Sequence, residues 1–257
     1  MTHPSEFFHP APGFVPAGVR IYAIGDIHGR ADLLARLLGK IADAAASAGS
    51  VLRQFIVFLG DYIDRGPLSR EVVELILNSL PLGFERVTLK GNHEWLLSRF
   101  LEDSTIGTGW VNNGGLATLA SYGLGGYQAA GAGAMDLETS ERARRELVKI
   151  IPPRHRDFFA GLGTACRLGG YVFAHAGVRP LVPLDHQDER DLIWIREPFL
   201  SSRADFGAVV VHGHSVRLEP DLHHNRIGID TGAYYTGRLT ALMLEGRKLR
   251  FLQTGEA

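Results

Sequence analysis

The sequence has one cysteine, no excess of charge of either sign and no long apolar run. Cys166 is the single cysteine among 257 residues, which excludes an internal disulfide and leaves stability to the core and to bound metal. Lys and Arg total 27 against 28 Asp and Glu, a balance that disfavours bulk nucleic-acid binding. No run of about 18 apolar residues, as a transmembrane helix requires, occurs, and the first residues lack the basic and apolar regions of an export signal. We therefore expect a cytoplasmic protein in a reducing setting, with no membrane partner.

The N-terminal stretch differs in composition from the rest of the chain. Residues 1–18 contain four prolines, which cannot donate backbone hydrogen bonds: Pro4, Pro10, Pro12 and Pro16. We predict a flexible arm over residues 1–18 and one domain over residues 19–257, a length that buries a substantial core.

Strands and amphipathic helices alternate over the first hundred residues. Residues 19–25 and 55–60 are short runs of β-branched and aromatic residues that lead into a Gly-Asp pair, the pattern of a buried strand that stops at a loop. Residues 30–48 and 69–80 have apolar side chains at helical spacing. A third strand is expected at residues 86–89, so the order is the strand-helix alternation of an α/β protein.

The pattern changes after residue 102. Residues 102–153 are rich in Gly, Ala and Ser and are predicted to form a helical insert, with helices over 115–122 and 137–151. Further strands are expected at residues 170–174, 207–211, 226–229, 239–244 and 249–252. The last two of these read as an antiparallel hairpin around Glu245 and Gly246.

Five short motifs place Asp, Asn or His at or just after a predicted strand. In order they are GDIHG (25–29), GDYIDRG (60–66), GNHE (91–94), HAG (175–177) and HGHS (212–215). Because α/β sheets bind ligands at strand ends, we expect these side chains to converge. Mixed nitrogen and oxygen donors suit Mn²⁺, Fe²⁺ or Zn²⁺ better than Ca²⁺. The number of donors implies two divalent ions, for which Mn²⁺ is the first choice and Fe or Zn also fit.

These motifs in this order resemble those of the calcineurin-like metallophosphoesterases, in particular the bacterial and phage type of the serine/threonine protein phosphatase branch. The resemblance spans residues 25–215 and implies an α/β sandwich of two mixed β-sheets flanked by helices. It also implies the metal ligands. The first metal would be held by Asp26, His28 and Asp61, and the second by Asp61, Asn92, His175 and His214, with Asp61 as the bridge.

The resemblance further implies how the site would act. Two divalent ions about 3.5 to 4 Å apart share a hydroxide and clamp the phosphoryl oxygens. His93 would be the general acid, oriented by Asp64. Arg65 would bind phosphate through its planar fork, with Arg196 and then Arg179 as further phosphate ligands.

Two features of the sequence favour different substrates. The chain keeps Asp64, which supports the acid that a poor alkoxide leaving group needs, so the predicted substrate is phosphoserine or phosphothreonine in proteins. The stretch WVNNGGLATLASYG (110–123) instead resembles diadenosine-tetraphosphatase-like relatives, and Trp110, Asn112 and Asn113 would there contact a base. The alternative is therefore a dinucleoside polyphosphate hydrolase, and a minor one is a non-catalytic metal-binding scaffold.

Several side chains keep more than one interpretation at this point. Trp110 and Tyr122 fit either the core of the insert or a base-stacking surface. His212 lies two residues before His214 and would either bind metal or support a ligand. The other histidines are expected at the surface or in loops: His3, His9, His155, His186, His223 and His224.

Overall fold

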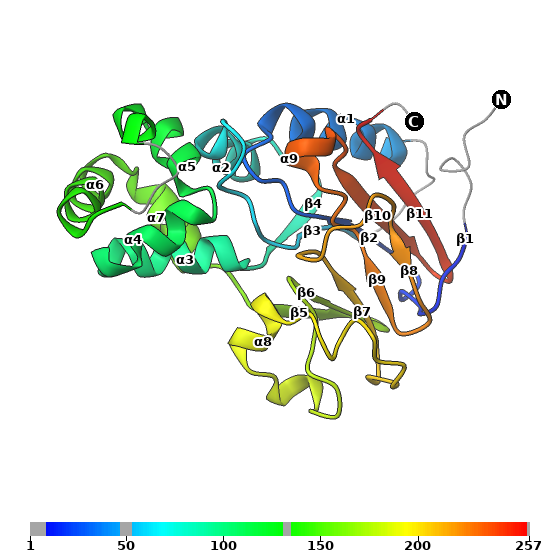
Figure 1. Ribbon diagram of the computed structural model, residues 1–257. Coiled ribbons are helices and arrows are strands. Elements are labelled where there is room, and N and C mark those ends of the chain that lie inside the picture. The colour runs from blue at the N-terminus through cyan, green and yellow to red at the C-terminus, as the bar shows by residue number, and fades with distance from the viewer. Residues whose placement is uncertain (1–8, 47–52, 131–134, 256–257) are drawn as a thin grey trace.

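The computed structural model describes residues 9–46, 53–130 and 135–255 and contains two mixed β-sheets with helices on their outer faces (Figure 1). The first sheet has the strand order β1-β11-β10-β2-β3-β4. Strands β2 (Val19–Ile24), β3 (Arg53–Phe58) and β4 (Phe84–Thr88) run parallel, whereas the hairpin of β10 (Thr240–Glu245) and β11 (Lys248–Gln253) joins β2 in antiparallel fashion. This architecture confirms the predicted fold class.

The second sheet has the strand order β5-β6-β7-β9-β8. Its three inner strands, β6 (Tyr171–Ala174), β7 (Val209–His212) and β9 (Arg226–Gly228), run parallel. At the two edges, β5 (Ala165–Leu168) is antiparallel to β6 and β8 (Asp221–Leu222) is antiparallel to β9. Neither edge strand was predicted. Both are short and partly exposed, so neither has the continuous apolar run that marks the inner strands.

Alternate residues of the strands enter two different cores. In β2, Ile21 and Ala23 belong to a cluster that both sheets share, while Tyr22 and Ile24 face the helices. Tyr171 and Phe173 of β6 fill the shared cluster from the other side. Because side chains alternate along each strand, one face of the first sheet packs against the second sheet and its other face packs against helices.

Helices cover the first sheet and approach its carboxyl edge. Helix α1 (Ala31–Ala46) and helix α2 (Ser69–Asn78) match the predicted amphipathic segments, although residues 47 and 48 lie outside the described part of the chain. Helix α3 (Asn92–Glu102) begins inside the GNHE motif rather than after it. The one-turn helix α9 (Ala233–Thr236) follows β9.

Helices also fill much of the connection between β4 and β5, and we call residues 104–130 and 135–160 together the helical segment. Figure 1 shows it gathered at one end of the molecule, opposite β1 and β11. Helices α5 (Gly115–Ser121) and α6 (Leu137–Ile150) match the two helices predicted here. The remaining elements are η2 (Ser104–Ile106), α4 (Gly107–Asn112), η3 (Gly125–Ala130) and α7 (Pro153–Ala160). A further pair, η4 (Leu184–His186) and α8 (Glu189–Trp194), lies outside the second sheet. No described helix is long and apolar enough to cross a bilayer.

The described part of the N-terminal stretch is attached to the first sheet. Strand β1 (His9–Pro10) pairs with β11, and the N–H of Val15 donates to the carbonyl of Gly246 at 2.8 Å. This differs from the flexible arm predicted for residues 1–18, of which residues 1–8 lie outside the described part. Proline is compatible with an edge strand because its missing N–H can face away from the sheet.

Candidate metal centre

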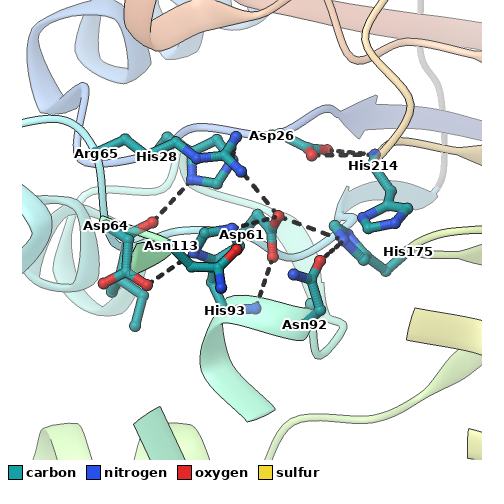
Figure 2. A network of polar contacts seen from close by, with 12 residues as sticks. Asp26, His28, Asp61, Asp64, Arg65, Asn92, His93, Asn113, His175 and His214 are labelled. Carbon is teal, nitrogen blue, oxygen red and sulfur yellow. Dashed lines mark hydrogen bonds and ion pairs between the residues drawn. The ribbon is translucent and has the colours of Figure 1, made fainter. Parts of the chain in front are cut away.

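Loops from both sheets bring the motif residues to one place, with Asp61 in the middle of the view in Figure 2. The carboxyl ends of parallel strands meet at the same edge of a sheet, and here the edges of two sheets face each other. Asp26 and His28 follow β2, Asp61 follows β3, Asn92 begins α3, His175 follows β6 and His214 follows β7.

The backbone of these loops is strained. Six described non-glycine residues have positive φ, and five of them lie in the motif loops: His28, Asp61, Asp64, Arg65 and His214. Each left-handed conformation of this kind costs on the order of 1–3 kcal/mol, so packing must hold it in place, as is common at functional sites.

Asp61 is the shared member of two groups of potential metal ligands. One group contains His28, Asp61 and His93, and the other contains Asp61, His175 and His214. The Oδ2 atom of Asp61 lies 3.5 Å from Nε2 of His28 and 3.4 Å from Nε2 of His175. One carboxylate thus borders both positions, as the bridging role implied by the resemblance requires.

Two imidazoles present lone pairs to the centre because backbone carbonyls hold their other nitrogens. Nδ1 of His28 lies 2.9 Å from the carbonyl of Ile63, and Nδ1 of His175 lies 3.0 Å from the carbonyl of Leu59. A carbonyl accepts a hydrogen bond from Nδ1–H, so the lone pair of the neutral imidazole is on Nε2. Nε2 of His175 lies 3.0 Å from Oδ1 of Asn92. A proton on Nε2 of His175 fits between these two atoms, and a bound cation would take its place.

His214 and Asp26 complete the cluster. Both oxygens of Asp26 accept the N–H of His214, at 3.0 and 3.2 Å. A Cβ on Gly213 would lie 1.9 Å from Oδ1 of Asp26, so only glycine allows this approach. Nε2 of His214 is buried without a hydrogen-bond partner. Burial, and then the nearby His175, lower the pKa of His214 to about 3, which keeps its imidazole neutral.

The balance of charge in the cluster favours bound cations. Burial, and then Asp230 beyond β9, raise the pKa of Asp26 well above its usual value. Burial disfavours a charged His175, but Asp61 and Asp26 outweigh it and raise the pKa of that imidazole to about 10. A buried group of carboxylates that draws protons in this way, with unpaired imidazole nitrogens and an amide oxygen around it, fits divalent cations.

His93 and Asp64 form a separate pair beside the centre. Nδ1 of His93 lies 2.7 Å from Oδ2 of Asp64, and both side chains are fully buried. Nε2 of His93 has no hydrogen-bond partner among the described residues and lies 3.8 Å from Oδ2 of Asp61. Burial lowers the pKa of His93, but Asp61 and Asp64 have the larger combined effect and raise it. The imidazole is thus equipped to deliver a proton from Nε2.

The three arginines proposed for phosphate have different surroundings. Arg65 is exposed, and its Nη1 donates to Nε2 of His28 at 3.0 Å. Arg196 is also exposed and helps to lower the pKa of His214 by its charge. The fork of Arg179 is instead bound to the carboxylate of Asp191, with both contacts at 2.6 Å.

Glu94 is a functional residue of the site that the sequence analysis passed over. Its carboxylate accepts the N–H groups of Asp61 and Tyr62 at 2.8 Å and that of Gly91 at 3.0 Å. Burial, and then the charge of Asp61, raise the pKa of Glu94 to about 7. Glu94 therefore connects the GDYIDRG and GNHE loops. Its position in the GNHE motif could have indicated this residue from the sequence.

Trp110 and Tyr122 are core residues, which excludes Trp110 as a base-stacking surface. The side chain of Trp110 is 0% exposed, and its Nε1 donates to Asp64. Tyr122 is buried with its hydroxyl 2.8 Å from Nδ1 of His155. His155 was expected at the surface but is buried, with Nε2 3.0 Å from Glu74.

Of the remaining polar candidates, Asn113 lies within the network of Figure 2, between Asp64 and Asp61 in that view. His212 is buried outside both groups of potential metal ligands in the described chain, with Nδ1 3.0 Å from the carbonyl of Gly213 and Nε2 3.4 Å from Arg226. Asn112 is exposed, and Asn113 donates to the carbonyl of Gly109. The other described histidines are exposed, namely His9, His186, His223 and His224, while His3 lies outside the described residues.

Comparisons with known proteins agree with this geometry. The family model of the calcineurin-like phosphoesterases matches residues 19–244. The chain is 30% identical to the bis(5'-nucleosyl)-tetraphosphatase PrpE [asymmetrical] of Anoxybacillus flavithermus, over 85% of this chain and 88% of that one. It is 35% identical to the serine/threonine-protein phosphatase 2B catalytic subunit A2 of Saccharomyces cerevisiae, but over only 37% of this chain and 15% of that one.

A crystal structure described as a candidate diadenosine tetraphosphatase superposes with a TM-score of 0.60 at 23% identity, covering 93% of this chain and 95% of that one. The family match spans the strands and loops that build the centre, and the chain belongs to the calcineurin-like phosphoesterase family.

Proposed function

We propose that the chain hydrolyses dinucleoside polyphosphates such as diadenosine tetraphosphate, with water cleaving a phosphoanhydride bond at the centre around Asp61. A relative that aligns over 85% of this chain carries the name of a bis(5'-nucleosyl)-tetraphosphatase. The structural observation that carries the proposal is a pair of exposed aromatic side chains, Tyr234 and Tyr235, at the rim of this centre.

The tyrosine pair offers a surface for a nucleobase. Tyr234 and Tyr235 are 37% and 56% exposed, with ring centroids 4.9 Å apart. The ring of Tyr234 lies 5.6 Å from that of His28 and 5.1 Å from the guanidinium carbon of Arg65. A base on these rings would leave its attached phosphates within reach of Arg65 and the metal ligands. Rigid aromatic faces beside convergent polar groups are typical of small-molecule sites.

The residues of the chain divide the chemistry between them. The cations would be held by Asp26, His28, Asp61, Asn92, His175 and His214. When bound, two divalent ions supply Lewis acidity and a nucleophile that is active near neutral pH. Arg65 donates to the same nitrogen of His28 that would bind metal. Because one lone pair serves one partner, a metal bound to this nitrogen would leave the guanidinium of Arg65 to bind phosphate oxygens. His93 holds its proton at Nε2 for the leaving oxygen.

Phosphoserine or phosphothreonine in proteins, the substrate that the sequence favoured, becomes the second candidate. It is supported by the hydrogen bond of 2.7 Å between His93 and Asp64, because an alkoxide leaving group depends on a general acid. The yeast phosphatase relative, however, aligns with only 37% of this chain. Membership of a phosphoesterase family makes the chain an enzyme, so a non-catalytic scaffold is set aside.

A substrate comparison with matched tyrosine variants tests the proposal. With Mn²⁺ present, kcat/KM is measured on diadenosine tetraphosphate and on a phosphothreonine peptide for the wild type, Tyr235→Leu and Tyr127→Leu. Tyr127 is the control because it is a partly exposed tyrosine of the helical segment, with the guanidinium carbon of Arg142 5.9 Å from its ring centroid. Base stacking on an aromatic ring contributes about 1–3 kcal/mol, so Tyr235→Leu should raise KM for the nucleotide roughly tenfold and leave the peptide unchanged.

Tyr127→Leu should affect neither substrate. A preference for the peptide in the wild type would replace the nucleotide proposal by the second candidate. Equal effects of Tyr235→Leu on both substrates would show that the tyrosine supports the fold and does not contact a base.

A further inference from the structure

The carboxylate of Asp64 is surrounded by donors, and two of them come from the helical segment. Nε1 of Trp110 lies 3.0 Å from Oδ2 and 3.2 Å from Oδ1. Oγ1 of Thr118 donates to Oδ1 at 2.6 Å. The third donor is Nδ1 of His93 at 2.7 Å, on the side of the metal centre in Figure 2. The relative exposure of all four side chains is 0%.

The backbone of Asp64 is fixed by the same helical segment. Asp64 has a φ of 69°, and its N–H is accepted by the hydroxyls of Thr118 at 2.9 Å and Ser69 at 3.1 Å. Thr118 therefore contacts both the main chain and the side chain of this strained residue. The position and the rotation of the carboxylate are set together.

The chemistry of the donors decides which nitrogen of His93 faces the substrate. An indole N–H can only donate, so Trp110 requires an acceptor and keeps Asp64 in that role. A carboxylate held in this way accepts from Nδ1 of His93, and the remaining nitrogen, Nε2, is directed to the centre without a partner. Removing either the indole N–H or the hydroxyl would let the carboxylate turn, and the imidazole with it.

We propose that Trp110 and Thr118 are positioning residues for the general acid His93, and that the helical segment acts on catalysis through Asp64. The proposal rests on phosphoester hydrolysis at this site but not on a nucleotide substrate. It gives the stretch from Trp110 to Gly123, which resembles nucleotide-cleaving relatives, a role in proton transfer. The segment is then required for any substrate whose leaving oxygen must be protonated.

The test compares two aryl phosphates that differ in their need for an acid. Trp110→Phe and Thr118→Val each remove one donor; Thr118→Val preserves the volume of the side chain, whereas Trp110→Phe also makes it smaller. On phenyl phosphate each should lower kcat by roughly tenfold or more, below the roughly 10²- to 10⁴-fold effect of a general acid itself. On p-nitrophenyl phosphate, whose leaving group needs little protonation, the loss should be less than threefold, the order expected from weak dependence on the acid. KM and the content of two metals should not change, and Thr118→Ser should restore the rate.

A spectroscopic measurement separates positioning from a merely structural role. In protein loaded with diamagnetic Zn²⁺, the Nδ1 proton of His93 should give a low-field NMR signal that is absent in His93→Asn. Trp110→Phe and Thr118→Val should shift this signal, while Trp95→Phe should not, because Trp95 packs against Trp194 and not against Asp64.

The proposal is overturned if the signal stays in place, or if both aryl phosphates lose the same fraction of their rate. If Trp110→Phe does not fold, the pair Thr118→Val and Thr118→Ser decides the question alone. Failure to cleave diadenosine tetraphosphate would overturn the nucleotide proposal, and it would leave the difference between the two aryl phosphates intact.

Discussion

Asp61 and Asp64 lie three residues apart in one loop, yet their carboxylates have opposite surroundings. Oδ2 of Asp61 faces the Nε2 atoms of His28, His93 and His175 at 3.4 to 3.8 Å. The oxygens of Asp64 receive an indole N–H, a hydroxyl and an imidazole N–H at 2.6 to 3.2 Å. A carboxylate with an oxygen that faces several imidazoles suits a shared cation, whereas one saturated by close donors is a fixed support.

The backbone produces this difference over a short distance. Both residues have positive φ, and the loop turns between them, so that Asp61 faces the junction of the sheets and Asp64 faces the helical segment. One loop thus supplies Asp61 to the candidate metal centre and Asp64 to His93, the proposed general acid. Variants that alter one side alone test whether the two functions are separable.

The largest effect is expected at Asp61. Asp61→Asn removes charge from both metal positions at once, so activity should fall to background and bound Mn²⁺, measured by elemental analysis, should decrease. Metal-stripped wild type should likewise be inactive and recover with Mn²⁺, because the nucleophile forms near neutral pH only on metal. An Asp61→Asn protein with two metals and a near-normal rate would show that the carboxylate is not the bridge.

On the Asp64 side the expected loss is smaller and depends on the substrate. His93→Asn should lower turnover of an alkyl phosphate by roughly 10²- to 10⁴-fold, the usual range of general acid catalysis. The metal content should stay at two ions, and p-nitrophenyl phosphate should be affected much less. Loss of metal in this variant would show that His93, like Asp61, helps to hold the metal ions.

Next in size is the contrast between two arginines. Arg65→Ala should weaken inhibition by inorganic phosphate about 10- to 100-fold, since a hydrogen bond to a charged group contributes about 1.5–3 kcal/mol. Arg179→Ala should leave it unchanged, because its fork is bound to Asp191. Inhibition constants for both variants check this, and the reverse order would make Arg179 the phosphate ligand.

The smallest effect on activity is expected at His212, a buried imidazole outside both groups of potential metal ligands in the described chain, and its effect is on stability. Burial is the main reason that its pKa falls to about 4. The unfolded chain, with a histidine pKa of about 6.5, then binds more protons, so stability falls as the pH drops from about 6.5 towards 4. His212→Gln should remove a part of this dependence, on the order of 3 kcal/mol. Urea unfolding of metal-free protein at both pH values measures it, and parallel curves for the two proteins would exclude His212 as the source.

The strand-end motifs allowed many of the candidate site residues to be predicted. The strands and side chains that pair with distant parts of the chain could not be predicted in this way. Each of GDIHG, GDYIDRG and GNHE carries its own signal, an apolar run followed by a polar group. The edge strands β5 and β8 have no such run, and β1 pairs through a proline-rich stretch that reads as irregular. His155 shows the same limit, since its burial follows from Tyr122 and Glu74, 33 and 81 residues away.

The sequence by itself determined the family, the α/β class and the candidate ligands, because these depend on short motifs next to strands that are recognisable locally. The tertiary structure decided what surrounds them. From the sequence Trp110 fits either the core or a base-stacking surface, and its buried place at Asp64, 46 residues away, decides for the core. Tyr234 carries no local signal until α9 brings it over Arg65. Burial and hydrogen bonding between distant residues are properties of the folded chain, so the roles that depend on them appear only in the fold.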